Sequence, residues 1–309
     1  MEIVRIDNTN ETRFETSLAL GNFDGVHIGH QKLILSMIET ADKTELRPSM
    51  MIFENHTKSF VFKNGPRLIN SNSQKNKFLE KLGVKTLYTM RFDDEVMTLS
   101  PRDFVSTLLY EKLNCRAITV GPDYRFGHKA KGDVEQLLAL SKELGIDTQI
   151  IQPVYHNDIL VSSTRIREHL TDGEIIEANK LLGRPFAIIG EVIHGKGLGK
   201  KLGVPTANIR PKDKYVIPKK GIYMTYTVIE GKSYPSATNI GVNPTFDEVD
   251  LKIENHIIGF DKQIYGKEIE IFFLEYVRPE KKFDSIEELK KRMLEDIRYV
   301  EQNTDLHLK

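Results

Sequence analysis

The chain has 309 residues, of which 39% are hydrophobic and 28% charged, with 44 Lys and Arg against 44 Asp and Glu. This length exceeds the about 100 to 200 residues of one typical domain, so we expect two domains, each with its own core. A net charge of zero argues against partners held by a broad positive field, such as duplex nucleic acid or an anionic membrane. A bound anion must therefore be held by a local arrangement of donors and charges.

One cysteine, Cys115, excludes an internal disulfide and fits a reducing compartment, so we expect a cytoplasmic protein. The N-terminal residues do not combine a basic segment with an apolar run, and stretches of about 18 consecutive apolar residues are absent from the sequence. We therefore expect neither a membrane span nor a secretory signal. The sequence leaves the oligomeric state open.

Short apolar runs alternate with segments of helical period through the first 183 residues. The pattern predicts strands at residues 17–20, 49–53, 86–90, 117–120 and 147–152, and helices at 29–41, 73–82, 101–113 and 134–144. Ser100 and Asp133 stand where N-caps of the last two helices belong. Such alternation is typical of right-handed βαβ units, so we predict a Rossmann-like α/β domain with a parallel sheet.

After two short predicted helices in residues 162–183, the pattern changes to strands separated by Gly and Pro. These strands are expected at residues 186–193, 221–230, 232–241, 251–258 and 267–277, and their close spacing predicts an antiparallel β-barrel. An amphipathic helix follows, opened by a capping box of Ser285 and Glu288. We place the boundary near Leu182 to Pro185, giving domains of residues 1–183 and 184–309.

The segment GNFDGVHIGH, residues 21–30, connects the first predicted strand to the first predicted helix. In a parallel sheet this turn faces the crevice where ligands bind. Gly21 and Gly25 let the backbone approach a phosphate, and the helix start near Gly29 directs N–H groups at it. His27 and His30 can then donate hydrogen bonds to phosphate oxygens.

Simpler interpretations of this segment stay open. Asp24 is equally well explained as a turn or cap residue. Two histidines three residues apart could bind zinc, although a third ligand is missing at a recognisable spacing.

Two further segments of the first half carry polar groups after apolar runs. GPDYRFG places Asp123 at the crevice, and Tyr124 and Phe126 suit either flavin contacts or simple packing. VSSTRIRE predicts a helix start rich in hydroxyl groups and arginine, which suits phosphate binding. Its simpler interpretation is an N-cap followed by a solvated basic face. The residues concerned are Ser162, Ser163, Thr164, Arg165 and Arg167.

GNFDGVHIGH, GPDYRFG, VSSTRIREHL and LLGRPF together resemble the adenylyltransferase module of bacterial riboflavin kinase/FAD synthetases, a HIGH-motif nucleotidyltransferase. The resemblance implies catalytic roles for His27, His30, Ser163, Thr164 and Arg167. It implies ATP binding by Gly21, Phe23, Asp24, Gly25, Gly29, Ser162 and Arg165, and flavin binding by Asn55, Asp123, Tyr124 and Phe126. In FENHT, Asn55 and Thr57 replace the two prolines of the family's FxPHP, which implies a less rigid loop.

The segment HGKGLGKKLGVPTANI, residues 194–209, combines a glycine-rich loop with lysines and PTAN. Backbone N–H groups of such a loop can surround phosphates, and lysines offset their charge. Thr206 and Asn208 present a hydroxyl and an amide oxygen on one face of an extended segment. These are oxygen ligands of the kind that hold Mg²⁺. The simpler interpretation is a turn followed by an edge strand.

This segment resembles the riboflavin kinase motif, and IGVNPTF, IENHIIGFDKQIYGKEI and FDSIEELKKRMLEDI follow in the order of that family. The resemblance implies Glu254 as catalytic base and Thr206 and Asn208 as metal ligands. Glu254 could otherwise be an outward-facing strand carboxylate, and His256 a supporting or structural residue. Lys200 replaces the family's usual arginine. The implied ATP-binding residues are Gly195, Lys196, Gly197, Gly199, Lys200 and Gly203.

The resemblance implies a bifunctional flavin enzyme that needs Mg²⁺. Riboflavin and ATP give FMN, and FMN with a second ATP gives FAD and pyrophosphate. An FMN phosphate, with a second pKa of about 6, is already anionic and needs no base, whereas the riboflavin hydroxyl does. The alternative is a monofunctional FAD synthetase whose C-terminal domain binds flavin or regulates.

Overall fold

The structure is a computed structural model that describes residues 1–6, 12–53, 66–91, 97–195, 197, 199, 202–244 and 249–307. The chain divides into two compact units. The first unit comprises Met1–Pro66 and Asn72–Val161, and the second comprises Arg67–Ser71 and Ser162–Lys309. The division by compactness thus falls after Val161, and the functional boundary expected at residues 183 and 184 stays a prediction.

The first unit is built on a parallel sheet of six strands in the order β1-β4-β3-β2-β5-β6. Five of them confirm predicted strands, and the sheet confirms the expected fold class. The strands are β1 (Glu2–Ile6), β2 (Thr16–Leu20), β3 (Arg47–Phe53), β4 (Thr86–Met90), β5 (Cys115–Val120) and β6 (Asp147–Ile150). Strand β2 is buried along its whole length, as expected for the centre of such a sheet.

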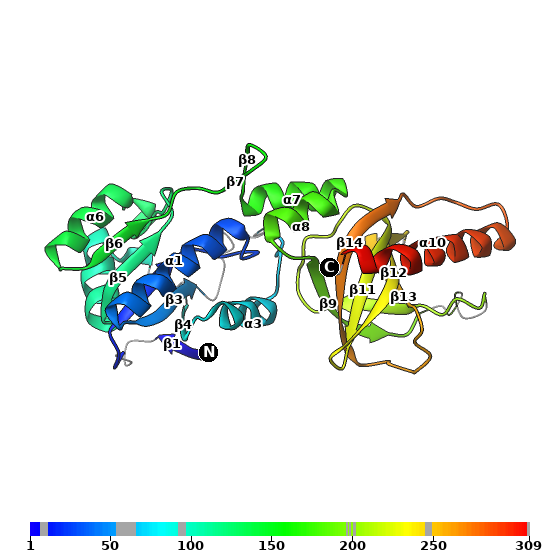
Figure 1. The fold of residues 1–309 in the computed structure, drawn as a ribbon, viewed down its shortest axis with the longest axis horizontal. Coiled ribbons are helices and arrows are strands. Elements are labelled where there is room, and N and C mark those ends of the chain that lie inside the picture. Colours follow the sequence, from blue (N-terminus) through cyan, green and yellow to red (C-terminus); the bar gives the residue numbers. More distant parts are fainter. Residues whose placement is uncertain are drawn as a thin grey trace. The chain divides into compact units, whose positions relative to one another are not determined.

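Helices cover both faces of this sheet (Figure 1). Helices α1 (Ile28–Thr44) and α3 (Asn72–Leu82) share one core, to which β2 contributes Ala19. On the other face, η1 (Phe104–Lys112) and α6 (Val134–Glu143) pack on Leu18 and Leu20. Alternate residues of β2 therefore supply the two cores, which is the period of a strand covered on both faces.

After two adjacent strands of this sheet, the chain continues toward opposite edges of the sheet. From β2 the chain goes on to β3, and from β5 it goes on to β6 on the other side. The register pairs Ala19 of β2 with Thr119 of β5, so both strands end at the same level. The chain therefore diverges after Leu20 and after Val120, and in open parallel sheets ligands bind at such a switch point. GNFDGVHIGH and GPDYRFG lie at this switch point, beyond the carboxyl ends of β2 and β5.

Three features of this unit were not predicted from the sequence. Strand β1 lies at the sheet edge with only Ile6 buried, so its apolar period is weak. The hairpin of β7 (Tyr155–His156) and β8 (Ile159–Leu160) is too short to show a pattern. The helix expected at residues 101–113 is α only in α5 (Pro101–Asp103) and continues as the π-helix η1. Its capping by Ser100, and that of α6 by Asp133, are confirmed.

The second unit contains a closed antiparallel barrel in the order β10-β13-β12-β11-β14-β9. Closure leaves no unpaired strand edge, which is the usual solution for an all-antiparallel sheet. The predicted strands and the barrel are confirmed, and β10 fits the extended segment expected at PTAN. The strands are β9 (Phe186–Ile193), β10 (Ala207–Pro211), β11 (Gly221–Ile229), β12 (Lys232–Pro244), β13 (Val249–Ile257) and β14 (Glu268–Arg278).

The second unit also contains helices α7 (Ser163–Asp172), α8 (Ile175–Leu182) and α10 (Ile286–His307). Helix α10 packs on β11, β12 and β14 through Val300, Met224 and Leu274 (Figure 1). At its start, Ser285 accepts the expected hydrogen bond from the N–H of Glu288. The Glu288 carboxylate, however, accepts from the N–H of Asp284, so the predicted capping box is only half formed.

The segment Arg67–Ser71 belongs to the second unit although it interrupts the first in sequence. Leu68 donates its N–H to the carbonyl of Lys214 and accepts from the N–H of Val216. Arg167 of α7 donates through Nε to the carbonyl of Arg67. These hydrogen bonds connect the segment to residues 214–216 and to helix α7.

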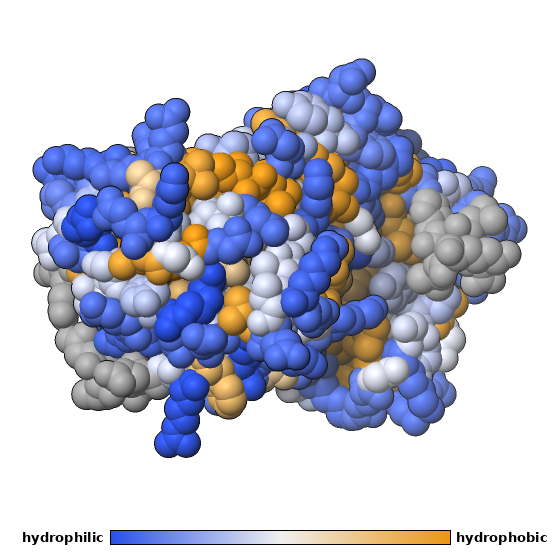
Figure 2. Space-filling view, turned by 60° about the vertical axis from the view of Figure 1, so that its left-hand side comes forward, coloured by the Kyte–Doolittle hydropathy of each residue, from blue (hydrophilic) through white to orange (hydrophobic). Residues whose placement is uncertain are grey.

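The face of the molecule in Figure 2 is mostly hydrophilic, with hydrophobic residues in smaller groups between. Exposed large hydrophobic residues are scattered over several elements, for example Leu35 in α1, Leu138 in α6 and Ile176 in α8. Single exposed residues of this kind are ordinary in soluble domains. Among the described helices, none is long and apolar enough to cross a membrane.

Candidate active sites

The loop after β2 has an unusual backbone. Phe23 and Val26 have φ angles of 47° and 40°, and Gly25 has 79°. A positive φ is costly for a β-branched residue such as Val26. The loop keeps this conformation because Phe23 and Val26 are buried, with 1% and 0% of their surface exposed, in the core shared by α1 and α3. Packing therefore fixes the turn that leads to the two histidines.

His27 caps helix α1 with its own ring. Its Nδ1 accepts a hydrogen bond of 3.2 Å from the backbone N–H of His30. An accepting Nδ1 carries no proton, so a neutral His27 must carry its proton on Nε2. A neutral His27 thus keeps one N–H donor, on Nε2. The N–H groups of Ile28 and Gly29 belong to the first helical turn, which has no intrahelical acceptors for them.

His30 stacks on His27, with ring centroids 3.6 Å apart and planes inclined by 17°. The two imidazoles therefore lie together, as expected from the sequence. Burial, then the charges of His27 and Lys75, lower the pKa of His30 well below its usual value. His30 is accordingly neutral at pH 7. Its Nδ1 is buried without a hydrogen-bond partner among the described residues.

Two glycines of the motif make room for rings. A Cβ at Gly29 would lie 3.2 Å from Cε1 and Nδ1 of His27, and one at Gly21 would lie 3.2 Å from the Phe23 ring. Both distances are shorter than ordinary carbon contacts. Besides any approach to phosphate, these glycines therefore let His27 and Phe23 fold against the loop.

Lys75 is a buried residue of this site that the sequence analysis missed. It lies on α3 one turn before Leu79, and only 8% of its surface is exposed. Burial lowers its pKa, whereas the nearby Asp24 carboxylate raises it. Asp24 is itself 4% exposed, so it is more than a solvated turn residue. In the sequence, Lys75 stands four residues before the buried Leu79, on the face of the helix that is expected to be buried. A lysine at such a position could have indicated a buried neighbour of opposite charge, here Asp24.

In the loop after β5, the three residues expected to bind flavin differ in their exposure to solvent. Asp123 is exposed, Tyr124 is half-buried, and Phe126 is 4% exposed within the core. Phe126 packs on Phe104 of η1, with centroids 5.4 Å apart, and on Tyr124 at 5.9 Å. Phe126 thus has a packing role, while Asp123 and Tyr124 remain accessible to a ligand.

The SSTRIR segment forms the start of α7, in the second unit. Ser162 is its N-cap and accepts from the N–H of Arg165. Arg165 pairs with Glu168 at 3.0 Å on the exposed face, while Arg167 binds the carbonyl of Arg67. Ser163 is half-buried and Thr164 is exposed. The predicted helix start is confirmed, and the predicted phosphate role of these residues stays a proposal.

In the second unit, two glycines border the expected metal ligands. A Cβ at Gly195 would lie 2.1 Å from Nδ2 of Asn208. A Cβ at Gly199 would lie 2.4 Å from the carbonyl oxygen of Val204 and 3.1 Å from Oγ1 of Thr206. The loop therefore closes directly over the PTAN segment. Only glycine permits so close an approach.

Glu254 lies on β13, beside Asn208 of β10 in the register. Its neighbours Ile253 and Asn255 are buried in the barrel, so Glu254 faces away from the interior. Its side chain is nevertheless only 25% exposed and pairs with Lys252 at 2.8 Å. His256 hydrogen-bonds through Nδ1 to the carbonyl of Pro205 at 2.7 Å and so holds the residue before Thr206.

The remaining predicted residues have simple placements. Gly197 and Gly203 have φ angles of 69° and 81°, which favour glycine. Asn55, Lys196 and Lys200 lie outside the described residues.

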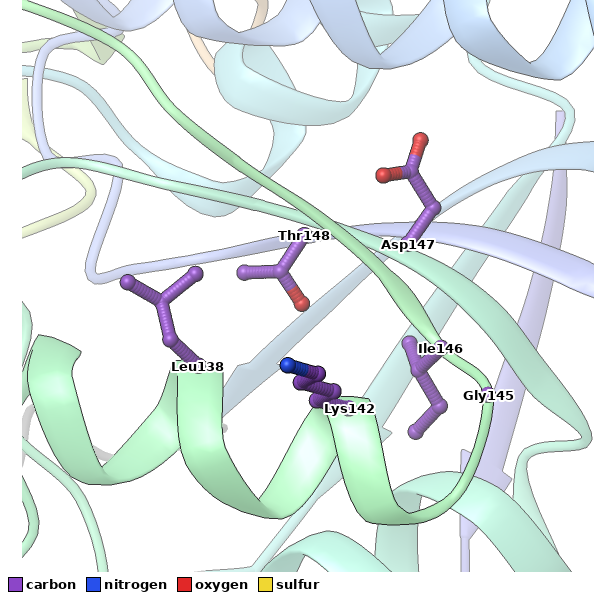
Figure 3. A pocket seen from close by; sticks show the side chains of 6 residues that line it. All are labelled: Leu138, Lys142, Gly145, Ile146, Asp147 and Thr148. Atoms are coloured by element: carbon purple, nitrogen blue, oxygen red, sulfur yellow. The ribbon is translucent and has the colours of Figure 1, made fainter.

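One surface depression lies away from these residues. Its lining combines Leu138 and Lys142 of α6 with residues 145–148 around the start of β6 (Figure 3). The amino end of β6 is the edge of the sheet opposite the carboxyl ends of the parallel strands. We therefore do not assign it to catalysis.

Together, a doubly wound domain with stacked histidines at its switch point and a barrel with a glycine-covered PTAN segment define a two-domain nucleotide-dependent transferase. The FAD synthetase family model matches residues 9–165, and the riboflavin kinase family model matches residues 182–304. The chain belongs to the bifunctional riboflavin kinase/FMN adenylyltransferase family. It is thus an enzyme of flavin cofactor synthesis that uses ATP and flavins.

Known proteins are similar over almost the whole chain. A Listeria monocytogenes bifunctional riboflavin kinase/FMN adenylyltransferase is 37% identical over 88% of this chain and 87% of its own. A Buchnera aphidicola protein of the same description is 33% identical over 99% and 100%. A solved Streptococcus pneumoniae structure, described as a macrolide-efflux protein, has a TM-score of 0.89 and 29% identity over 97% and 99%. The presence of both domains favours the bifunctional enzyme over the monofunctional alternative.

Lys75→Met tests the buried pair in the first unit. Methionine keeps the apolar stem but removes the ammonium group, so Asp24 loses its neighbouring charge. We expect adenylyl transfer to FMN to slow by about 100-fold, the effect of a misplaced catalytic loop. Phosphorylation of riboflavin by the same protein should not change.

The matched control is Lys77→Met, which removes an exposed lysine of the same helix. It should leave both activities at the wild-type level. Equal rates for the Lys75 and Lys77 variants would show that the buried charge has no role in the site.

Gly195→Ala tests the glycine cradle of the second unit. The new methyl group would displace the Asn208 amide rather than the backbone. We expect the riboflavin kinase rate to fall about tenfold or more and its Mg²⁺ requirement to rise. Asn208→Ala should have a similar effect, and the double variant should be little worse than either. Additive losses would indicate that Gly195 acts independently of Asn208.

Proposed function

We propose that the stacked histidines carry out adenylyl transfer and that Glu254 and the PTAN segment carry out phosphorylation. The observation that supports this division best is the pairing of His27 with His30 at the switch point of the sheet, far in sequence from Glu254. The two reactions attack different phosphorus atoms with different nucleophiles, so two sites are required.

In adenylyl transfer, an FMN phosphate oxygen forms a bond to the α-phosphorus of ATP, and the bond to the pyrophosphate oxygen breaks. His27 Nε2–H and neutral His30 would donate hydrogen bonds to the charge that develops on the phosphates. The resemblance also implies phosphate binding by the hydroxyl groups of Ser163 and Thr164 and by the guanidinium of Arg167. Asp123 and Tyr124 would contact the flavin. Catalysis thus depends on alignment and charge stabilisation, without a general base.

In the kinase reaction, the nucleophile is the 5′-hydroxyl of riboflavin. Glu254 would accept its proton as the hydroxyl oxygen bonds to the γ-phosphorus and ADP leaves. Lys252 holds the Glu254 carboxylate in the structure, and a bound substrate would compete for this carboxylate. Gly195, Gly197, Gly199 and Gly203 would bring the loop backbone onto the ATP phosphates.

Mg²⁺ fits the oxygen donors of the second unit. Thr206 supplies a hydroxyl and Asn208 an amide oxygen, and the backbone of Gly195 and Gly199 approaches both side chains closely. Within the described part of the chain, His, Cys, Asp and Glu side chains do not form a metal-binding group of three or more. In the proposed site, Mg²⁺ would be held by Thr206 and Asn208 together with ATP. When bound, it would reduce the negative charge of the phosphates.

We also propose a cytoplasmic location, with small molecules rather than nucleic acid or membrane as partners. The use of ATP as co-substrate supports this location. The single cysteine of the sequence, Cys115, also fits a reducing compartment.

Paired variants test the assignment of the two sites. The purified protein is incubated with riboflavin, ATP and Mg²⁺, and the flavins are separated by chromatography. Wild type should give FAD, His30→Ala should accumulate FMN, and Glu254→Gln should leave riboflavin unchanged yet convert supplied FMN to FAD. Each loss should exceed about 100-fold. Loss of both activities in either folded variant would disprove two independent sites.

The pH dependence of adenylyl transfer tests the neutral state of His30. Because its pKa is lowered in the folded protein, His30 stays neutral as the pH rises from about 6.5 to 8. The rate should rise with ionisation of the FMN phosphate near pH 6 and then stay level. A fall centred near pH 7 that His30→Gln abolishes would show that the imidazolium is required.

A further inference from the structure

Asn239 stands in line with two predicted kinase residues. In the register, Asn239 of β12 lies opposite Glu254 of β13, and Glu254 lies opposite Asn208 of β10. Residues directly opposite on antiparallel strands project to the same face, with Cβ atoms about 4.5 to 5.5 Å apart. Asn239, Glu254 and Asn208 therefore form a row across three strands. Neither the motifs nor the site described above uses Asn239.

The row is separate from the polar groups inside the barrel. On β12, Thr238 and Ile240 are completely buried on either side of the half-buried Asn239. The interior hydroxyl groups bond to one another, and Asn255 donates to Thr227 at 2.8 Å. Asn239 projects to the opposite face, so it does not serve that internal network.

The amide oxygen of Asn239 lacks a partner. Its Oδ1 is buried and forms no hydrogen bond within the part of the chain that the structure describes. A buried acceptor without a donor costs free energy, which folded proteins usually avoid. This position therefore calls for a hydrogen-bond donor from a ligand. The complementary group would be an O–H or N–H of a bound molecule that also lies beside Glu254 and Asn208.

We propose that Asn239 is a substrate-binding residue of the kinase reaction, whose Oδ1 accepts a hydrogen bond from a hydroxyl group of the riboflavin side chain. This inference rests on the proposed role of Glu254. The ribityl chain carries several hydroxyl groups beside the one that is phosphorylated. A bond from one of them to Asn239 holds the 5′-hydroxyl beside Glu254, which takes its proton. A water molecule bound to Mg²⁺ offers the same O–H donor and is the competing source.

Asn239→Leu is the decisive variant, because leucine has a similar shape and no polar atoms. We expect kcat/KM for riboflavin to fall about 10- to 100-fold, the effect of losing a substrate hydrogen bond. The melting temperature should stay the same or rise, because the unpartnered oxygen is removed. A lower melting temperature would indicate a structural role and overturn the inference. Conversion of FMN to FAD by the same sample is the internal control and should not change.

Two measurements separate the sources of the donor. If Asn239→Leu raises the KM for riboflavin and leaves the Mg²⁺ dependence unchanged, the ribityl hydroxyl is the donor. If only the Mg²⁺ dependence changes, metal-bound water is the donor and the proposal is wrong. Ser233→Ala, at an exposed position of the same strand, should behave as wild type.

Riboflavin analogues that lack single ribityl hydroxyl groups test the contact in the unmodified enzyme. One analogue should lose about as much kcat/KM with wild type as riboflavin loses with Asn239→Leu, and should lose nothing more with the variant. If every analogue loses equally with both proteins, the contact does not exist. Wild type that forms no FMN would instead refute the proposed kinase function.

Discussion

The missing Cβ atom at a few glycines decides where the reactive side chains of both units can lie. Gly29 leaves room for the His27 ring to fold onto the helix start, and Gly195 leaves room for the Asn208 amide. Gly29 lies two residues after His27 in the chain, whereas a whole loop separates Gly195 from Asn208. The absence of a Cβ atom thus makes room for an imidazole in the α/β domain and for an amide in the β-barrel. In both units the space reserved by glycine is occupied by the protein's own side chain.

The two units hold their functional groups with different degrees of rigidity. In the first, Phe23 and Val26 are buried, so a strained loop is fixed by the core. In the second, Glu254 and Asn208 stand on paired strands of a closed barrel, where the register itself sets their spacing. A sheet without edges can deform little at one strand without disturbing its neighbours. Precise positioning therefore comes from packing in one unit and from backbone hydrogen bonds in the other.

The sequence predicted most of the fold because the apolar periods of buried elements are strong. Strands β2 to β5 and the long barrel strands were found in this way, and the N-caps Ser100, Asp133 and Ser162 were recognised by their side chains. Strand β1 was missed because an edge strand buries too little to show a period. The π-helical turns of η1 have the same composition as an α-helix, so only the backbone reveals them. Lys75 and Asn239 were missed since their importance depends on burial and on partners remote in sequence, which motifs do not show.

The segment Arg67–Ser71 gives the chain an uncommon path. Because the segment belongs to the second unit, the chain passes between the units after Pro66, after Ser71 and after Val161. A fragment ending at Val161 would carry Leu68 without Lys214 and Val216, its hydrogen-bond partners. A fragment beginning at Ser162 would leave Arg167 without the carbonyl of Arg67. A single gene truncation therefore cannot release either unit whole, and a dissection into modules would need a rearranged chain order.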